Sequence, residues 1–131
     1  MTEGSRHVPC VGGIVQDSAG RLLLVQRANE PGRGRWSVPG GRVEAGETDQ
    51  QAVVRELAEE TGLIVVPGPL VGRVVRGPYV IADYRCEAVG GELRAGDDAS
   101  DARWVDAAAL ARLPLVEGLL DALSEWDALP R

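Results

Sequence analysis

The feature that most constrains this chain is a segment, residues 41–63, that carries start and stop signals for one helix. Thr48 and Gln51 have the Thr-x-x-Gln spacing of a capping box, in which side chain and backbone at the helix start bond to each other. Gly62 stands where a left-handed residue ends a helix. We therefore expect a helix between Thr48 and Gly62 that packs on a sheet through one apolar face. The side chains expected on that face are Val53, Val54, Leu57 and Thr61.

Three glutamates crowd the last turn of this helix, which is unfavourable by local electrostatics. At about 100° per residue, Glu56, Glu59 and Glu60 fall within an arc of roughly 100° on one face. Like charges four residues apart repel, and anions at a helix C-terminus meet the negative end of the helix dipole. The pattern indicates a compensating cation, and oxygen donors favour a hard divalent ion, Mg²⁺ or Mn²⁺, over zinc. A solvated acidic face is the simpler alternative.

A short strand ending in two glycines precedes the helix. Residues 36–41 read Trp-Ser-Val-Pro-Gly-Gly, and the pair Gly40-Gly41 lets backbone approach a ligand closely. A strand, a double glycine, a capped helix and three acids on one face follow one another in order. This conjunction favours a metal site over a solvated helix face.

The segment resembles the signature of the Nudix hydrolases, G-x5-E-x7-R-E-U-x-E-E-x-G-U, where U is a bulky aliphatic residue. Nine specified positions match, namely Gly41, Glu47, Arg55, Glu56, Leu57, Glu59, Glu60, Gly62 and Leu63. The resemblance implies the α/β Nudix fold, a mixed β-sheet sandwiched between helices. It also implies a site for Mg²⁺, or alternatively Mn²⁺, whose ligands are the carbonyl of Gly41 and the carboxylates of Glu56, Glu59 and Glu60.

The predicted catalytic residues are Arg55, Glu59 and Asp98. Arg55 acts through an ion pair with Glu47 that braces the loop and helix, while Gly40 and Gly62 shape the backbone as structural support. Asp98 comes from the acidic loop 96–101, because Nudix enzymes commonly draw a further ligand or a general base from this neighbourhood. Asp101 is the second choice in that loop, although acids in such loops are most often turn formers.

Five residues are candidates for binding the substrate: Arg27, Arg33, Arg35, Trp36 and Tyr79. The arginines flank the loop before the box and could contact phosphate oxygens. A solvated surface role is an equal alternative for them. Trp36 and Tyr79 could line a base pocket, although a place in the core is the more favoured interpretation for the tryptophan.

Composition agrees with one enzyme domain, residues 1–131. The net charge is −6, so the surface lacks the basic excess of nucleic-acid-binding proteins. Cys10 and Cys86 are expected to be free, buried thiols. No signal peptide and no apolar run of 18 residues is present, which excludes a membrane span and favours a cytoplasmic protein. We expect a monomer or homodimer whose partner is a small nucleotide.

Turn residues divide the rest of the chain into further elements. Residues 8–16 and 21–28 are apolar runs around Asp-Ser-Ala-Gly, which predicts a hairpin. Residues 63–76, 79–89 and 102–105 favour strands. Residues 110–126 are largely helical in pattern, with Pro114 as a break.

The resemblance implies a metal-dependent hydrolase that cleaves the pyrophosphate linkage of a nucleoside diphosphate joined to another moiety, or of a nucleoside triphosphate. Metal-activated water would attack, with Glu59 or a loop acid as base. Pro78 and Tyr79 stand fifteen and sixteen residues after the box, so the family's spacing rule leaves ADP-ribose-like and MutT-like substrates open. The alternative function is a non-catalytic sensor of nucleotides or sugars, which the intact box disfavours.

Overall fold

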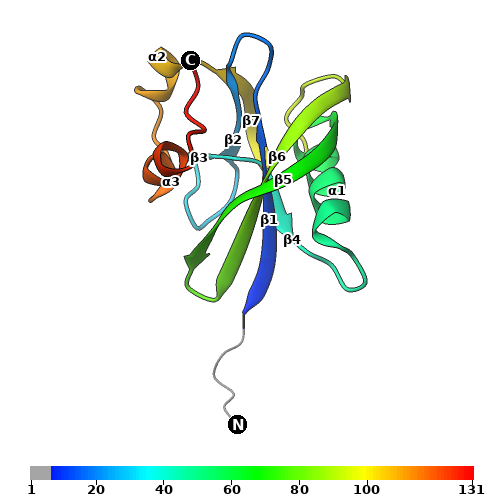
Figure 1. Cartoon of the computed structure of the whole chain (residues 1–131). Helices are drawn as coiled ribbons and strands as arrows, with labels where there is room; N and C mark the ends of the chain where they lie inside the picture. Colours follow the sequence, from blue (N-terminus) through cyan, green and yellow to red (C-terminus); the bar gives the residue numbers. More distant parts are fainter. Residues whose placement is uncertain (1–6) are drawn as a thin grey trace.

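The computed structural model describes residues 7–131, which form two β-sheets flanked by helices (Figure 1). The elements in chain order are β1 (Val8–Val15), β2 (Leu22–Arg27), β3 (Trp36–Ser37), β4 (Gly40–Arg42), α1 (Asp49–Thr61), β5 (Leu63–Arg76), β6 (Tyr79–Gly91), β7 (Ala99–Val105), α2 (Ala107–Leu110) and α3 (Leu119–Glu125). Helix α1 lies on one side of the molecule, and α2 and α3 lie on the other (Figure 1).

The larger sheet has the order β4-β1-β6-β5, and the smaller has the order β3-β2-β7. Strands β1 and β6 run parallel, while their outer neighbours β4 and β5 are antiparallel to them, so the larger sheet is mixed. The smaller sheet is antiparallel throughout. The α/β class and the mixed sheet expected from the sequence are confirmed, with the strands divided between two sheets.

The expected hairpin between the first two strands forms only at its tip. The carboxylate of Asp17 accepts hydrogen bonds from the backbone N–H groups of Ala19 and Arg21, which fixes the turn. Gln16 and Leu22 then form one antiparallel bridge. Beyond this bridge β1 joins the larger sheet and β2 the smaller one, so the turn prediction is correct but the strand pairing is not.

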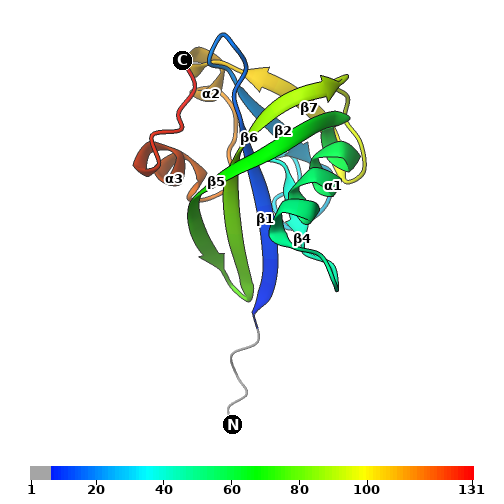
Figure 2. The ribbon, with the colours of Figure 1, turned by 45° about the vertical axis from the view of Figure 1, so that its right-hand side comes forward.

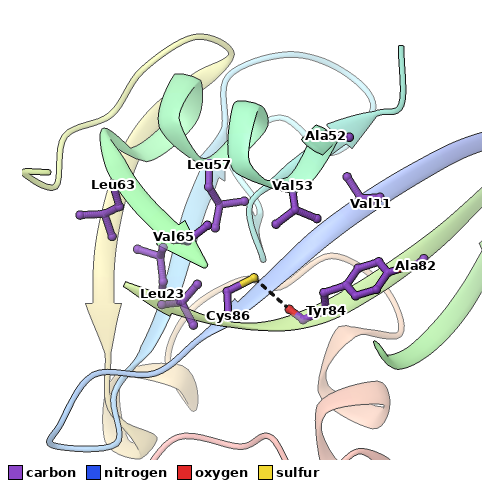
Figure 3. Close-up of a cluster of buried hydrophobic side chains, with 11 residues drawn as sticks. Val11, Leu23, Ala52, Val53, Leu57, Leu63, Val65, Ala82, Tyr84 and Cys86 are labelled. Atoms are coloured by element: carbon purple, nitrogen blue, oxygen red, sulfur yellow. Dashed lines mark hydrogen bonds between the residues drawn. The ribbon is translucent and has the colours of Figure 1, made fainter. Parts of the chain in front are cut away.

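Helix α1 packs on the larger sheet through Ala52, Val53 and Leu57, whose side chains Figure 3 shows, and Thr61 of the same helix is also buried. The prediction was wrong for Val54, whose residue is 38% exposed. Successive helical residues are about 100° apart, and the buried arc continues from Val53 toward Ala52 instead. Cys86 is buried in this cluster, its thiol donating to the carbonyl of Tyr84 at 3.4 Å (Figure 3), and Cys10 is half-buried; both are free.

The C-terminal segment is less helical than expected. The helix predicted over residues 110–126 is replaced by short α2 and α3, and residues 111–118 between them are not helical. Pro114 lies in this gap, and Gly118 at its end has a φ of 83°, which ordinary residues rarely adopt. Leu110, Leu119 and Leu123 from these helices belong to a second core cluster. Its other buried members are Ile14, Leu22, Leu24, Trp36, Val105 and Ala128.

Two strands exceed their predicted lengths. Strand β7 begins at Ala99, three residues before the predicted start, and β6 reaches Gly91. Strand β5 continues past Pro67 and Pro69, but its pairing with β6 shifts register there because proline lacks the N–H that a ladder needs. In the part of the chain that the structure describes, no helix is long and apolar enough to cross a membrane.

Candidate functional site

The caps predicted for α1 are present and fix where its last turn lies. Thr48 Oγ1 accepts from the backbone N–H of Gln51 at 3.1 Å, and the Gln51 side chain accepts from the N–H of Thr48 at 2.9 Å. Gly62 has a φ of 75°, and its N–H donates to the carbonyl of Ala58. The C-terminal half of the helix therefore places Glu56 and Glu60 beside the short strand β4 and Glu59 beside Arg55.

The two glycines of β4 bring its backbone against these acids. The N–H of Gly40 donates to Glu60 Oε1 at 2.8 Å. The carboxylate of Glu56 lies against Gly41, where a Cβ would lie 2.5 Å from it. A side chain at Gly41 would displace Glu56, whereas one at Gly40 would overlap the backbone of Val11 in β1, so each glycine is required by a different close approach.

Arg55 is the cation at the centre of the site. Its guanidinium donates to both oxygens of Glu47, at 2.7 and 2.9 Å, which is the ion pair expected from the sequence. It also contacts Glu56 at 2.9 Å, Glu59 at 3.3 Å and the carbonyl of Arg42 at 3.0 Å. The hydrogen bonds from Arg55 lower the pKa of Glu47 to about 2, and the same contacts raise the pKa of Arg55. Arg55 is thus a permanent cation tied to three acids.

Glu60 has the most perturbed environment of the three glutamates. Burial is the largest cause, and together with the charges of Glu56 and Asp98 it raises the pKa of Glu60 to about 8. The hydrogen bond from Gly40 and the charge of Arg27 act in the opposite direction. Burial also raises the pKa of Glu56. Burial and negative neighbours therefore both oppose ionisation of Glu60, and a bound cation would favour its ionised form.

The acidic loop between β6 and β7 closes the C-terminal end of α1. The N–H groups of Gly96 and Asp97 donate to the carbonyls of Glu60 and Glu59, at 2.9 and 3.1 Å. Gly96 lies so close to the Glu59 carbonyl that a Cβ would overlap it. These bonds satisfy two of the carbonyls that a helix end otherwise leaves unpaired. The loop is thereby held against the turn that carries the acids.

The two aspartates proposed from this loop have different surroundings. Asp98 has a φ of 63°, its carbonyl accepts from the N–H of Ala28 at 3.2 Å, and its Oδ1 accepts from Asn29 at 3.1 Å. It stands near enough to Glu60 to raise the pKa of that group. The carboxylate of Asp101, by contrast, accepts from the backbone of Ala102 and from Arg103. The structure thus brings Asp98 to the glutamates and engages Asp101 elsewhere.

The three candidate arginines around the loop between β2 and β3 lie in different surroundings. Arg27 donates from Nε to the carbonyl of Pro31 at 2.6 Å, and its charge acts on Glu60. Arg35 donates to the carbonyl of Leu115 at 3.1 Å, in the segment before α3. Arg33 is exposed, and its backbone N–H lies 3.4 Å from the Glu30 carboxylate. Only Arg27 of the three is brought to the acids.

The two aromatic candidates lie in different environments. Trp36 is 3% exposed within the second core cluster, and Arg103 covers its ring at 5.1 Å from the centroid. A base cannot stack on it in this conformation. Tyr79 is half-buried, its hydroxyl accepts from Arg42 at 3.2 Å, and Arg42 lies 5.5 Å from its ring centroid. Tyr79 therefore stays available to line a base pocket.

The side chains fit a hard divalent ion by their donor chemistry. Glu56, Glu59 and Glu60 offer only oxygens, which Mg²⁺ and Mn²⁺ prefer. Within residues 7–131, however, no three acids, histidines or cysteines converge on one point as a finished metal site. Glu56 and Glu59 face Arg55 while Glu60 faces Gly40. Glu60 is a largely buried carboxylate with Glu56 and Asp98 as negative neighbours, and this environment favours a cation beside it.

The sequence predictions missed Asp83, a buried acid in the middle of β6. It is 3% exposed, and its Oδ1 has no hydrogen-bond partner in the described part of the chain. Burial raises its pKa to about 7, and the charge of Arg76 opposes this. The available signal was a lone aspartate within the apolar run of residues 79–86.

Comparisons with known proteins agree with this geometry. The NUDIX domain family matches residues 6–126. The chain is 42% identical over 109 residues to an ADP-ribose pyrophosphatase of Methanocaldococcus jannaschii, covering 79% of this chain and 64% of that protein. It is 43% identical over 110 residues to a putative 8-oxo-dGTP diphosphatase 2 of Mycobacterium tuberculosis, covering 79% of this chain and 76% of that one. A NUDIX hydrolase structure from Nitrosomonas europaea shares the fold, with a TM-score of 0.83 over 98% of this chain and 77% of that one, at 22% identity.

Proposed function

The chain belongs to the Nudix hydrolase family, and on that premise we propose that it is a pyrophosphohydrolase of small nucleotide derivatives. The aligned region spans 64% of the archaeal ADP-ribose pyrophosphatase and 76% of the mycobacterial relative. The observation that carries the proposal is that Glu56 and Glu60 lie against the backbone of β4 while Arg55 holds Glu56 and Glu59 beside them. A stable helix end does not require this crowding of acids, whereas metal-dependent hydrolysis does.

The metal would be held by the carboxylates of Glu56, Glu59 and Glu60 and by the carbonyl of Gly41. Mg²⁺ is the favoured ion and Mn²⁺ the alternative. When bound, such an ion lowers the pKa of water and neutralises charge that develops on phosphate oxygens. The overall charge of −6 makes that neutralisation necessary, because a polyphosphate would otherwise be repelled.

The protein's own side chains would orient the substrate and accept the proton. Of the three candidate arginines, Arg27 is the one whose charge acts on Glu60, and it would bind phosphate oxygens as a charge-assisted donor. Asp98 is the first candidate for the general base, since its carboxylate is exposed beside Glu60 and has one hydrogen-bond donor, Asn29. Glu59 is the second candidate, although it also contacts Arg55. Arg55 and Glu47 would hold the loop and the helix in register.

The substrate class would be a nucleoside diphosphate linked to another moiety, or a nucleoside triphosphate. The two relatives support these two options, since one is an ADP-ribose pyrophosphatase and the other a putative 8-oxo-dGTP diphosphatase. Hydrolysis of the first type yields a nucleoside monophosphate and a phosphorylated remainder. Hydrolysis of the second type yields a nucleoside monophosphate and pyrophosphate.

A hydrolysis screen tests the proposal. The purified chain would be incubated with ADP-ribose, NDP-sugars, dinucleoside polyphosphates, dNTPs and 8-oxo-dGTP, each with Mg²⁺, with Mn²⁺ and with EDTA. We expect cleavage of at least one compound at the pyrophosphate linkage, abolished by EDTA and by Glu60→Gln. The exposed acid Glu92 provides a matched control, because Glu92→Gln removes one charge outside the site. Binding of these compounds without any cleavage would contradict the proposal and favour a sensor module.

A further inference from the structure

One row of residues crosses the larger sheet with almost no side chains. By strand register, Gly40 in β4 pairs with Gly12 in β1, Gly12 with Asp83 in β6, and Asp83 with Gly72 in β5. Residues paired in this way share one face of a sheet. Val11, Ala82 and Tyr84 alternate with the row and pack under α1, so the row lies on the opposite face.

Asp83 is the only polar side chain in this row, and it lies over Gly12. A Cβ on Gly12 would overlap Asp83 Oδ1, so the glycine makes room for the carboxylate. On the other side, a Cβ on Gly72 would overlap the Trp126 ring, and Val38 lies against Gly12. In the described part of the chain, folding has therefore buried an acceptor that has no donor, in space that the two glycines leave free and that Val38 and the Trp126 ring border. Such a group is expensive to retain unless something else supplies the donor.

On one side of Asp83, the next row provides an apolar floor that leads away from it. Cys10, Ile81 and Val74 share this row and are half-buried, with the exposed Arg42 at its end in β4. The row on the other side of Asp83 includes Arg85. Beyond the apolar floor stands Tyr79, with Arg42 over its ring. The ends of β5, β6 and β1 that carry these residues extend past α2 and α3, and α1 covers only the other face (Figures 1 and 2).

We propose that Asp83 determines which nucleobase this protein accepts, by receiving hydrogen bonds from the exocyclic amino group of a bound base. This inference rests on the proposed function, since it takes the substrate to be a nucleotide. The row joins the two parts of the site, because Gly40 contacts Glu60 at one end and Asp83 lies two strands away. Two strand spacings are about 9–10 Å, comparable to the length of a nucleoside. Phosphates at the glutamates would thus place the base over the apolar floor, with its edge toward Asp83.

The chemistry of a carboxyl group defines the bases that fit. Guanine, adenine and cytosine each carry an exocyclic amino group that can donate to an acceptor. Guanine adds a ring N–H beside its amino group, so it can fill both carboxylate oxygens. Hypoxanthine and uracil lack the amino group and would leave Asp83 with fewer donors. The expected preference is therefore for amino-bearing bases over their oxo or unsubstituted counterparts.

Binding of matched nucleoside monophosphates tests this without depending on catalysis. The Kd of the whole chain would be measured by calorimetry in the presence of Mg²⁺ for GMP against IMP, AMP against purine riboside monophosphate, and CMP against UMP. We expect at least one amino-bearing member to bind about 10-fold or more tightly than its partner, the range of a hydrogen bond to a charged group. Asp83→Leu should reduce that ratio to near one. Asp83→Asn, which keeps one acceptor, should reduce the ratio for GMP and IMP only in part.

The control is Glu87→Gln, which removes an exposed acid from the same strand and should leave every ratio unchanged. Ratios below about twofold for all three pairs in the native chain overturn the inference, as does the absence of measurable binding. Discrimination that survives in Asp83→Leu also overturns it, as does a GMP to IMP ratio unchanged from the native chain in Asp83→Asn if the leucine variant does not fold. Discrimination without hydrolysis of any substrate would contradict the proposed function alone. Hydrolysis without base discrimination would contradict this inference alone.

Discussion

The guanidinium of Arg55 lies 2.7 and 2.9 Å from the two carboxylate oxygens of Glu47, in a bidentate pair that joins the loop after β4 to the middle of α1. Side chains in such a pair are held in one plane, which adds geometric specificity to the charge attraction. Because the same guanidinium contacts Glu56 and Glu59, the geometry of the pair also sets where these acids lie.

Arg55→Ala should lower stability and activity together. The substitution leaves Glu47, Glu56 and Glu59 without their shared donor, and about a fifth of the Arg55 side chain is exposed, so solvent offsets part of the loss. We expect Tm to fall by several degrees with or without metal, measured by thermal melts, and kcat/KM to fall by orders of magnitude. Arg85→Ala, at a half-buried arginine on another strand, is the comparison. An unchanged Tm with lost activity would mean that Arg55 binds substrate instead.

The same pair predicts how stability changes in acid. The pKa of Glu47 is lowered to about 2 in the folded chain, against about 4 in an unfolded one. Its contribution is therefore complete above about pH 4 and is lost as the pH falls from about 4 to 2. Glu47→Gln should lose less stability than the native chain over that window, as seen in denaturant melts at each pH. If the free energy of unfolding depends on pH in the same way for the two proteins, Glu47 does not titrate as described.

Glu60→Gln should abolish turnover while sparing the fold. The raised pKa of Glu60, about 8, means that the folded state favours its protonated form. In metal-free buffer its contribution to stability is fully present below about pH 4 and is lost as the pH rises toward 8. The glutamine variant should therefore gain Tm over the native chain at pH 8.5 and little at pH 4.5. Near-native turnover in this variant would exclude Glu60 as a metal ligand.

Asp98→Asn should slow the reaction while leaving substrate affinity within a few-fold. Asp98 stands beside Glu60, whereas the adjacent Asp97 contributes its backbone N–H to the end of α1. Loss of a group that acts mainly in the transition state lowers kcat more than it changes KM. Asp97→Asn should be nearly silent and is the matched control. If Asp98→Asn keeps the native rate and pH profile, Glu59 becomes the first candidate for the base.

Asp83→Asn should stabilise the folded chain at alkaline pH. With a folded-state pKa of about 7, Asp83 favours its neutral form, so stability is lost as the pH rises from about 4 to 7. Because the asparagine cannot ionise, the substitution should raise the free energy of unfolding at pH 8.5 by roughly 2–4 kcal/mol and change it little at pH 4. Urea melts at the two pH values measure the difference. Equal changes at both would indicate that Asp83 does not ionise in the folded state.

The sequence predicted best where local signals determine structure. The start and end of α1 were predicted because Thr48, Gln51 and Gly62 act within one helical turn of each end. The pairing of Glu47 with Arg55 followed from the family resemblance and is present in the structure. The acids on the last turn were likewise placed correctly, since helix periodicity alone puts them on one face.

Predictions failed where contacts between residues far apart in the sequence determine the structure. Val54 has the side chain of a core residue, but its direction from the helix axis leaves it exposed. The strands around Asp17 and Gly20 separate into two sheets because each finds partners far along the chain. Asp83 could not be interpreted from sequence, since its significance depends on Gly12 and Gly72 facing it from neighbouring strands.

The contact of Gly96 with the end of α1 also has a consequence for how this protein can change over evolutionary time. A Cβ there would overlap the Glu59 carbonyl, and the backbone N–H groups of Gly96 and Asp97 are committed to the same helix turn. Insertions are tolerated where backbone is exposed and unbonded. The turn at Gly77 has open space around it and can lengthen freely. The loop at Gly96 can diverge in the identity of its side chains but not in the number of residues that reach the helix.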